Sequence, residues 1–395
     1  MLDEMKDTEV YPNSITYNTL LAAYTNQSSR KSKRNKRNDR SGGFQKIDTT
    51  SAEKLFDKMR NDPNIVPDVV TYNTMLHAYS RNGDVEKAEA LLQDMCLEES
   101  PVSPDSTSIN TVINAWTKSN RNQAPQRAEA ILEQMLKPHA SSQWGGKLAA
   151  IRPTSITFNT VMSAWTRTRK AEAAERCQNL FYLMANNGVA HINPDFVTFN
   201  IMIHSWSLSN REDAPEKAEA LLVEMIHKFN AGNARMRPNT KTYGSLINLW
   251  SRSRRPESGE KAEEYLKKII QIAEGKQNSH RQNSRSFKEE QPRVFEFTST
   301  MRAWHNSGNP IAPYKADEIL HLLLEQVKQG NKLANPDSKL FGVFLQILAS
   351  SNIPDKNIYA DRVVQMMIKF KIEPNKMLLD ALQRCYSGAQ IHNDD

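Results

Sequence analysis

Two short sequence phrases alternate along this chain, and their repetition constrains the fold more than any other feature. The first phrase is PDVVTYNT at 67–74. Related sequences begin at Pro12, Pro104, Pro153, Pro194 and Pro238, and weaker copies begin at Pro292, Pro336 and Pro374. Seven residues after the aromatic position of the phrase comes another large aromatic residue, which is tryptophan at 116, 165, 206, 250 and 304. A fixed pattern of this kind indicates one structural unit that is repeated along the chain.

The second phrase predicts an amphipathic helix. It is rich in alanine, leucine, glutamate and lysine, which favour helix, and KAEALLQDM at 87–95 represents it. There Ala88, Leu91, Leu92 and Met95 lie at i, i+3, i+4 and i+7, which places them on one stripe. The other copies occupy 51–59, 127–135, 176–184, 217–225, 261–269, 315–323 and 359–367.

The first phrase also predicts a helix, because its apolar residues follow a helical stripe over 70–79. Proline followed by Asp or Asn stands ahead of this stripe and supplies an N-cap. The two helices form a hairpin that cannot bury its apolar stripe alone, so successive hairpins must stack. We therefore expect an all-α solenoid with the tryptophans in its core, although a length of 395 residues would otherwise suggest two or three domains.

Residues 70–95, VTYNTMLHAYSRNGDVEKAEALLQDM, closely resemble the pentatricopeptide repeat, a helical hairpin specialised for single-stranded RNA. The resemblance covers essentially the whole chain and implies a right-handed α-solenoid of stacked helix-turn-helix repeats. The tetratricopeptide repeat is the alternative, but its Trp-x2-Leu-Gly-x2-Tyr pattern is absent from the first helix. Membership of the pentatricopeptide family would imply a location in the mitochondrion or the plastid.

The resemblance divides the chain into eight repeats between two partial ones. Repeats one to eight occupy 14–68, 69–105, 106–154, 155–195, 196–239, 240–293, 294–337 and 338–375, between a partial repeat at 1–13 and a partial repeat with a tail at 376–395. Insertions occupy 26–50, 138–150 and 275–291, and the polar, charged composition of the first and last predicts disorder. The start of the chain matches the end of the second phrase, so we expect that its true N-terminus, with any organelle leader, lies further upstream.

By this resemblance, each repeat faces one RNA base, which two or three side chains read. The first reader ends the Tyr-Asn part of the first phrase, at Asn18, Asn73, Asn110, Asn159, Asn200, Gly244, Thr298 and Gly342. The second reader is the last residue of the repeat, at Asp68, Asp105, Thr154, Asp195, Asn239, Arg293, Asp337 and Asn375. A further residue, three positions before the first reader, would sandwich the base, at Ile15, Val70, Thr107, Ile156 and Val197.

Both sets of readers have an alternative interpretation. The aspartates at 68, 105, 195 and 337 stand where an N-cap is expected, and capping alone would explain them. Asparagine is tolerated but not favoured in a first helical turn. Five asparagines in one register, out of 34 in the chain, therefore indicate a role besides helix formation. We interpret the asparagines as base contacts. For the aspartates, helix capping alone and a role in base selection are both left open.

The pairing preferences of the family convert these residues into an expected RNA sequence. Asn with Asp favours uridine, Asn with Asn favours a pyrimidine, and Thr with Asp favours guanosine. A carboxamide suits a pyrimidine edge because it offers one donor and one acceptor. With the N-terminal repeat at the 5′ side, repeats one to five give U, U, pyrimidine, U and pyrimidine, and repeat seven gives G. Repeats six and eight have glycine as their first reader, so the pairing preferences assign no base to them.

Basic residues recur nine positions after the phrase aromatic, at Arg81, Lys118, Arg167 and Arg252. They would either contact phosphate, which makes binding sensitive to salt, or complement the dipole at a helix C-terminus. The net charge is +7, but the run at 30–40 holds seven cations and one acid and so carries +6 of it. That run reads as a solvated flexible loop, a non-specific RNA contact or a nuclear localisation signal.

We find no motif for catalysis or metal binding, namely no Walker A, GxGxxG, GxSxG or HExxH sequence and no Cys-x2-Cys pair with a His-x-Glu. Three distant cysteines argue against a disulfide framework and a zinc site, and no window approaches the roughly 20 apolar residues of a membrane span. We expect a non-enzymatic monomer that binds single-stranded RNA without a cofactor or membrane, with accessory proteins as further partners. The alternative is a helical scaffold that binds proteins.

Overall fold

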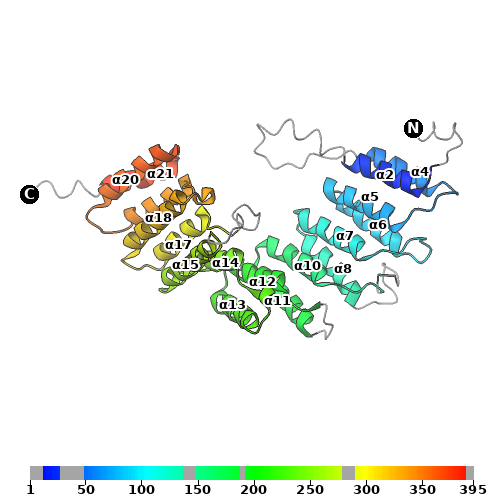
Figure 1. The fold of residues 1–395 in the computed structure, drawn as a ribbon, viewed down its shortest axis with the longest axis horizontal. Coiled ribbons are helices and arrows are strands. Elements are labelled where there is room, and N and C mark those ends of the chain that lie inside the picture. The colour runs from blue at the N-terminus through cyan, green and yellow to red at the C-terminus, as the bar shows by residue number, and fades with distance from the viewer. Residues whose placement is uncertain are drawn as a thin grey trace, which may run out of the picture. The chain divides into compact units, whose positions relative to one another are not determined.

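The computed structural model describes residues 12–26, 49–136, 147–148, 150–186, 192–277 and 290–387. Every regular secondary-structure element in these residues is a helix (Figure 1). The first phrase of each repeat forms α2 (Ser14–Asn26), α5 (Val69–Asn82), α7 (Ser106–Lys118), α10 (Ser155–Thr168), α12 (Phe196–Leu208), α14 (Thr240–Arg252), α17 (Val294–Asn306), α19 (Ser338–Ala349) and α21 (Lys376–Ser387). The second phrase forms α4 (Thr50–Arg60), α6 (Val85–Cys96), α8 (Ala124–Leu136), α11 (Ala171–Asn186), α13 (Ala214–Asn230), α15 (Ser258–Gln277), α18 (Ala312–Lys328) and α20 (Lys356–Phe370). Two 3-10 helices, Ala234–Met236 and Lys332–Ala334, complete these elements. The all-α prediction is confirmed.

The chain forms two compact units, Met1–Ile201 and Met202–Asp395, which we call the N-terminal and the C-terminal unit. Within each unit a first-phrase helix packs against the second-phrase helix of its own repeat and against the first-phrase helix of the next repeat, as α5 packs on α6 and α7 and α17 packs on α18 and α19. Repeats stacked in this way make an α-solenoid, as predicted. The repeat boundaries remain a prediction, and the basic run at 30–40 and most of each insertion lie outside the described residues.

The helices begin where the sequence supplies a cap. Asp68 accepts a hydrogen bond from the backbone N–H of Thr71 at 2.8 Å, and the Thr71 hydroxyl accepts one from the Asp68 N–H at 3.2 Å. The same reciprocal capping box opens α7 at Asp105, α10 at Thr154 and α14 at Asn239. Because four N–H groups at each helix start lack a partner within the helix, these side chains fix where the four helices begin.

The tryptophans of the common register lie in the core, as predicted from their spacing. Trp116, Trp165, Trp206, Trp250 and Trp304 each expose no more than 3% of their surface. The three cysteines are also buried, as free thiols. No helix in the described part of the chain is long and apolar enough to span a bilayer.

A buried tryptophan–glutamate hydrogen bond connects one repeat to the next. Trp116 Nε1 donates to Glu89 Oε2 at 2.8 Å, from α7 to α6, and Trp304 Nε1 donates to Glu263 Oε2 at 3.1 Å, from α17 to α15. A cation from the second-phrase helix of the later repeat joins the pair, since Arg127 forms an ion pair with Glu89. Each carboxylate is therefore held by two groups of the repeat that follows it.

Glu129 shows the same arrangement one repeat further along. Trp165 Nε1 donates to Glu129 Oε2 at 2.8 Å, and Arg176 lies 3.8 Å from Glu129 Oε1. The Arg176 guanidinium also lies over the Trp165 ring, 5.6 Å from its centroid. Burial raises the pKa of the Glu129 carboxyl, and the contacts with Arg176 and Trp165 only partly offset that rise.

Repeat six departs from this pattern. Its Trp250 Nε1 is buried without a hydrogen-bond acceptor in the described residues, because Tyr265 and Lys261 take Glu219 instead. The Tyr265 hydroxyl donates to Glu219 Oε1 at 2.8 Å, and Lys261 Nζ lies 3.1 Å from the same oxygen. The glutamate still joins two successive repeats, through the hydroxyl of α15 in place of the indole.

We expect Glu129→Ala to lower the free energy of unfolding by about 1–3 kcal/mol, because it leaves the buried Trp165 N–H without an acceptor. Urea denaturation followed by circular dichroism measures the change. The matched control is Glu133→Ala, one turn further along α8, where the side chain is exposed. A loss no larger than that of the control would show that the hydrogen bond does not hold successive repeats together.

Candidate nucleic-acid interface

Three of the predicted reader pairs are in direct contact. Asn18 Nδ2 lies 3.3 Å from Asp68 Oδ1, Asn73 Nδ2 lies 3.3 Å from Asp105 Oδ1, and Asn159 Nδ2 lies 3.2 Å from Asp195 Oδ1. In each pair the amide donates to the carboxylate that caps the first-phrase helix of the next repeat. The two readers of one repeat therefore belong to one hydrogen-bonded group that bridges two helices.

A hydroxyl group from the third residue of the next helix completes the first two pairs. Thr71 Oγ1 lies 2.7 Å from Asn18 Oδ1, and Ser108 Oγ lies 2.7 Å from Asn73 Oδ1. The amide oxygen thus faces a hydroxyl and the amide nitrogen faces a carboxylate, so the orientation of each amide is fixed. The sequence alone does not predict that these hydroxyl groups orient the amides. Its only signal was the recurring Thr or Ser three residues after the cap.

The hydrogen bonds also set the charge of the aspartates. Burial alone would raise the pKa of Asp68, but the hydrogen bonds from Thr71 and Asn18 outweigh it and hold the pKa below its usual range. The same balance, with Ser108 and Asn73 as donors, lowers the pKa of Asp105. Both groups are therefore carboxylates at neutral pH.

The structure does not join the readers of repeats three and seven. No hydrogen bond connects Asn110 with Thr154 in the described chain, and Asn110 Oδ1 is buried without a partner there. The Thr298 hydroxyl donates to the Val294 carbonyl of its own helix at 2.8 Å, while Asp337 accepts from the Leu340 N–H. Leu340 has no hydroxyl that could orient a reader, which distinguishes repeat seven from the first two.

Repeat five falls at the division between the compact units. Asn200 Nδ2 donates to the Phe196 carbonyl at 2.8 Å within α12. Asn239 belongs to the C-terminal unit and caps α14 through the N–H groups of Lys241 and Thr242.

The two glycine readers lie in different surroundings. A Cβ atom on Gly244 would lie 3.4 Å from Glu296 Oε1, and a Cβ atom on Gly342 would lie 2.6 Å from the Met377 methyl group. The second readers of these repeats are Arg293, whose backbone N–H donates to Glu296 Oε2 at 2.8 Å, and Asn375, which accepts from the Leu378 N–H at 3.0 Å.

The residues predicted to sandwich the base form an exposed row. Ile15 is 74% exposed and Val197, the least exposed of the large ones, is 47% exposed. Val70, Thr107 and Ile156 are exposed as well. Single exposed apolar residues are normal, but their recurrence at one register leaves a series of apolar contacts open to a ligand. Phe295, which is 43% exposed, occupies the same register in repeat seven, three residues before Thr298, and is a further residue of this kind that was not among the predicted ones.

Two of the four predicted phosphate contacts hold a neighbouring helix end. Arg81 Nη1 donates to the Thr25 carbonyl at 3.1 Å, and Arg252 Nη1 donates to the Ser207 carbonyl at 3.3 Å. These carbonyls belong to the last turn of the preceding first-phrase helix, where backbone acceptors lack partners. Lys118 and Arg167 are exposed, and the described residues include no hydrogen-bond or ion-pair partner for them. A phosphate role remains a prediction for all four.

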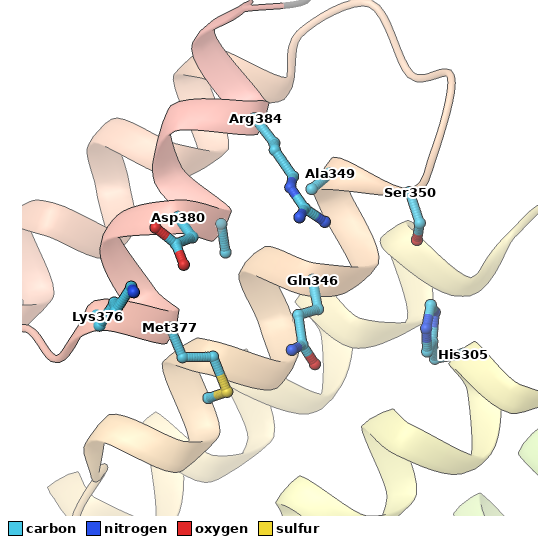
Figure 2. A pocket seen from close by; sticks show the side chains of 9 residues that line it. His305, Gln346, Ala349, Ser350, Lys376, Met377, Asp380 and Arg384 are labelled. Carbon is cyan, nitrogen blue, oxygen red and sulfur yellow. The ribbon is translucent and has the colours of Figure 1, made fainter.

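A pocket of about 710 Å³ lies along α19 and α21 in the C-terminal unit (Figure 2). Polar and charged side chains line it, including Gln346, Lys376, Asp380 and Arg384. Asp380 follows Pro374 by six residues, as Asn73 follows Pro67, so it stands at the first-reader register of the partial ninth repeat. The volume is within the range of small-ligand pockets.

The model of the PPR repeat family matches residues 67–118, and that of the pentatricopeptide repeat domain matches residues 1–32. Similar proteins include the pentatricopeptide repeat-containing protein At5g18475 of Arabidopsis thaliana, 33% identical over 93 residues, which are 23% of this chain and 15% of that protein. The chloroplastic pentatricopeptide repeat-containing protein At3g06430 of the same plant is 27% identical over 136 residues, 34% of this chain and 23% of that protein. The alignments thus span less than a quarter of either relative's length.

Among solved structures, the crystal structure of the pentatricopeptide repeat protein PPR10 in complex with an 18-nucleotide psaJ RNA element is similar to this chain. The identity is 16% and the TM-score is 0.32, over 98% of this chain and 62% of that one.

We expect Asp105→Ala to lower the free energy of unfolding by about 1 kcal/mol at pH 7, because it removes the cap of α7 and the partner of Asn73. The pKa of Asp105 is lower in the folded state than in the unfolded chain, so its stabilisation is present above about pH 4 and is lost as the pH falls further. Urea denaturation at pH 7, 5 and 3.5 measures this. Glu98→Ala, at an exposed position, is the control. A deficit that stays constant down to pH 3.5 would contradict a role for the carboxylate charge.

Proposed function

Because this chain belongs to the pentatricopeptide repeat family, we propose that it binds single-stranded RNA with sequence selectivity, one base per repeat. The observation that carries the proposal is the set of amide–carboxylate pairs at 18 and 68, 73 and 105, and 159 and 195. Helical repeats of this class read one base each with two or three side chains. Readers that are already held together before RNA arrives have less side-chain entropy to lose on binding.

The chemistry of the pairs favours pyrimidines in the N-terminal repeats. Uracil carries an N–H beside a carbonyl, and a carboxamide offers the acceptor and the donor that complement them. Repeats one, two and four, with Asn and Asp, would select U. Repeat three, where the described chain shows no contact between Asn110 and Thr154, and repeat five, where both readers are Asn, would take a pyrimidine with less discrimination. Repeat seven, with Thr298 and Asp337, would select G.

The exposed row from Ile15 to Val197 supports base contact of a second kind. Apolar side chains at this register would lie against the flat faces of successive bases, which is a contact that any base can make. This contact would supply affinity, whereas the reader pairs would supply selectivity. Lys118 and Arg167, exposed on the same first-phrase helices, are the best placed of the predicted phosphate contacts.

Several relatives are named chloroplastic, which supports a plastid as the place of action. The mitochondrion is the alternative compartment. We place the protein in organellar RNA processing, stability or translation. Its mechanism would be passive, since a bound solenoid blocks nucleases or opens an RNA structure without chemistry of its own.

Filter binding with poly(U) and poly(A) at 50 and 200 mM salt tests RNA binding against the scaffold alternative. RNA reading predicts a clear preference for poly(U) that survives the higher salt, because only the phosphate part of the affinity is screened. A helical scaffold for proteins would retain neither polymer, or would retain both weakly and release them at the higher salt.

The substitution Asn73→Thr tests the reader pair of repeat two. We expect the preferred second base to change from U to G, with a shift of roughly tenfold in relative affinity. Binding to RNA 8-mers that vary only at this base measures it. Asn114→Thr, on the first-phrase helix of repeat three but outside the reader register, is the control. An unchanged second-base preference would remove Asn73 from the readers.

A further inference from the structure

In repeat six the place of the missing first reader is taken by a carboxylate from the next repeat. Gly244 of α14 has no side chain there, and Glu296 of α17 points toward it, with Oε1 3.4 Å from the position that a Cβ atom would occupy. The other oxygen, Oε2, accepts the backbone N–H of Arg293 at 2.8 Å. The described structure gives Oε1 no hydrogen bond from another residue, so this oxygen is available to a ligand.

Glu296 is the counterpart of the hydroxyl residues that orient the readers of repeats one and two. It is the third residue of its helix, as Thr71 and Ser108 are of theirs. Those shorter side chains reach only as far as the reader amide of the preceding repeat. Where that amide is absent, the longer glutamate extends into its place.

The Glu296 side chain is buried to the same degree as one of the predicted first readers. It is 8% exposed, and the reader Asn159 of repeat four is also 8% exposed. A charged side chain buried to this degree is uncommon unless it is paired. Its donors are two backbone N–H groups, those of Arg293 and of Glu296 itself, and a carboxylate can accept about four hydrogen bonds, so acceptor capacity is left unused.

We propose that Glu296 reads the base of repeat six and selects guanine, an inference that rests on the proposed function. An ionised carboxylate is an acceptor only. Guanine alone among the four bases presents two adjacent N–H donors, at N1 and N2, on its Watson–Crick edge. Uracil, cytosine and adenine each place an acceptor beside their donor, and that acceptor would face the carboxylate.

The surroundings of Glu296 support this choice. Burial raises the pKa of the Glu296 carboxyl, although the backbone N–H groups of Arg293 and Glu296 and the charge of Arg293 act against that rise. The two N–H donors of guanine would favour the ionised form further. Phe295, the preceding residue, is exposed at the register of the sandwiching side chains, and a phenyl ring stacks on the large face of a purine.

The second glycine reader shows that glycine alone does not make such a site. Beside Gly342 the nearest atom is the methyl group of Met377, at 2.6 Å from the Cβ position, which offers no acceptor and fills the space. Repeats six and eight, which share a glycine at this register, therefore differ in what they present to RNA.

Fluorescence anisotropy with the four RNAs UUCUCNGU, in which N is the sixth base, tests the inference. We expect the RNA with G at this position to bind about tenfold more tightly than the RNA with U, as for one bidentate base contact. In Glu296→Gln, which keeps the cap of α17, the preference for G should disappear while discrimination at the second base stays. Glu325→Gln, at an exposed position of α18, should behave as the wild type.

A second variant covers the case in which Glu296→Gln does not fold. Gly244→Asn combined with Glu296→Thr rebuilds the arrangement of repeats one and two, and it should change the preferred sixth base from G to U. Wild-type protein that binds the pyrimidine tract without regard to the sixth base overturns the inference alone, as does a G preference that persists in Glu296→Gln. Failure to bind any of the four RNAs overturns the proposed function itself.

Discussion

The hydrogen bond between a buried tryptophan and the glutamate of the preceding repeat is the contact on which the rest of the structure depends. Apolar stripes hold stacked helices together, but they do not fix how far one helix slides along another. The N–H of Trp116 or Trp165 finds its acceptor only at one position of the neighbouring helix, and an unsatisfied buried N–H is costly. The bond therefore sets the register between repeats.

That register places the side chains that we propose as base readers. With successive first-phrase helices aligned, the cap and third residue of one helix meet the fifth residue of the helix before it, as Asp105 and Ser108 of the Trp116 helix meet Asn73. A slip of one residue would separate the amide from both partners. The stabilising interaction at one end of the first-phrase helices and the candidate interface at the other are thus products of the same alignment.

The sequence predicts most of the fold and only part of the site. Helix type, stacking and buried tryptophans follow from periodicity, since any chain with these stripes must bury them. The roles of Thr71, Arg81 and Glu296 could not be read in the same way, because each depends on a partner one repeat away. Arg81 illustrates this: its spacing suits a phosphate contact, yet its guanidinium donates to the carbonyl of Thr25. Spacing identifies which residues recur, whereas their neighbours decide what they do.

The hydrogen-bonded group of Asn18, Asp68 and Thr71 has a consequence for how such arrays can change in length. Asp68 is the last residue of one repeat and Thr71 the third of the next, so the group spans the point at which a repeat would be duplicated or deleted. An exchange at that point keeps each amide with its own carboxylate but gives it a new third residue. Under the proposed function, the base preference carried by a transplanted repeat would be partly decided by the repeat that follows it, and a modular cut would lie a few residues further on.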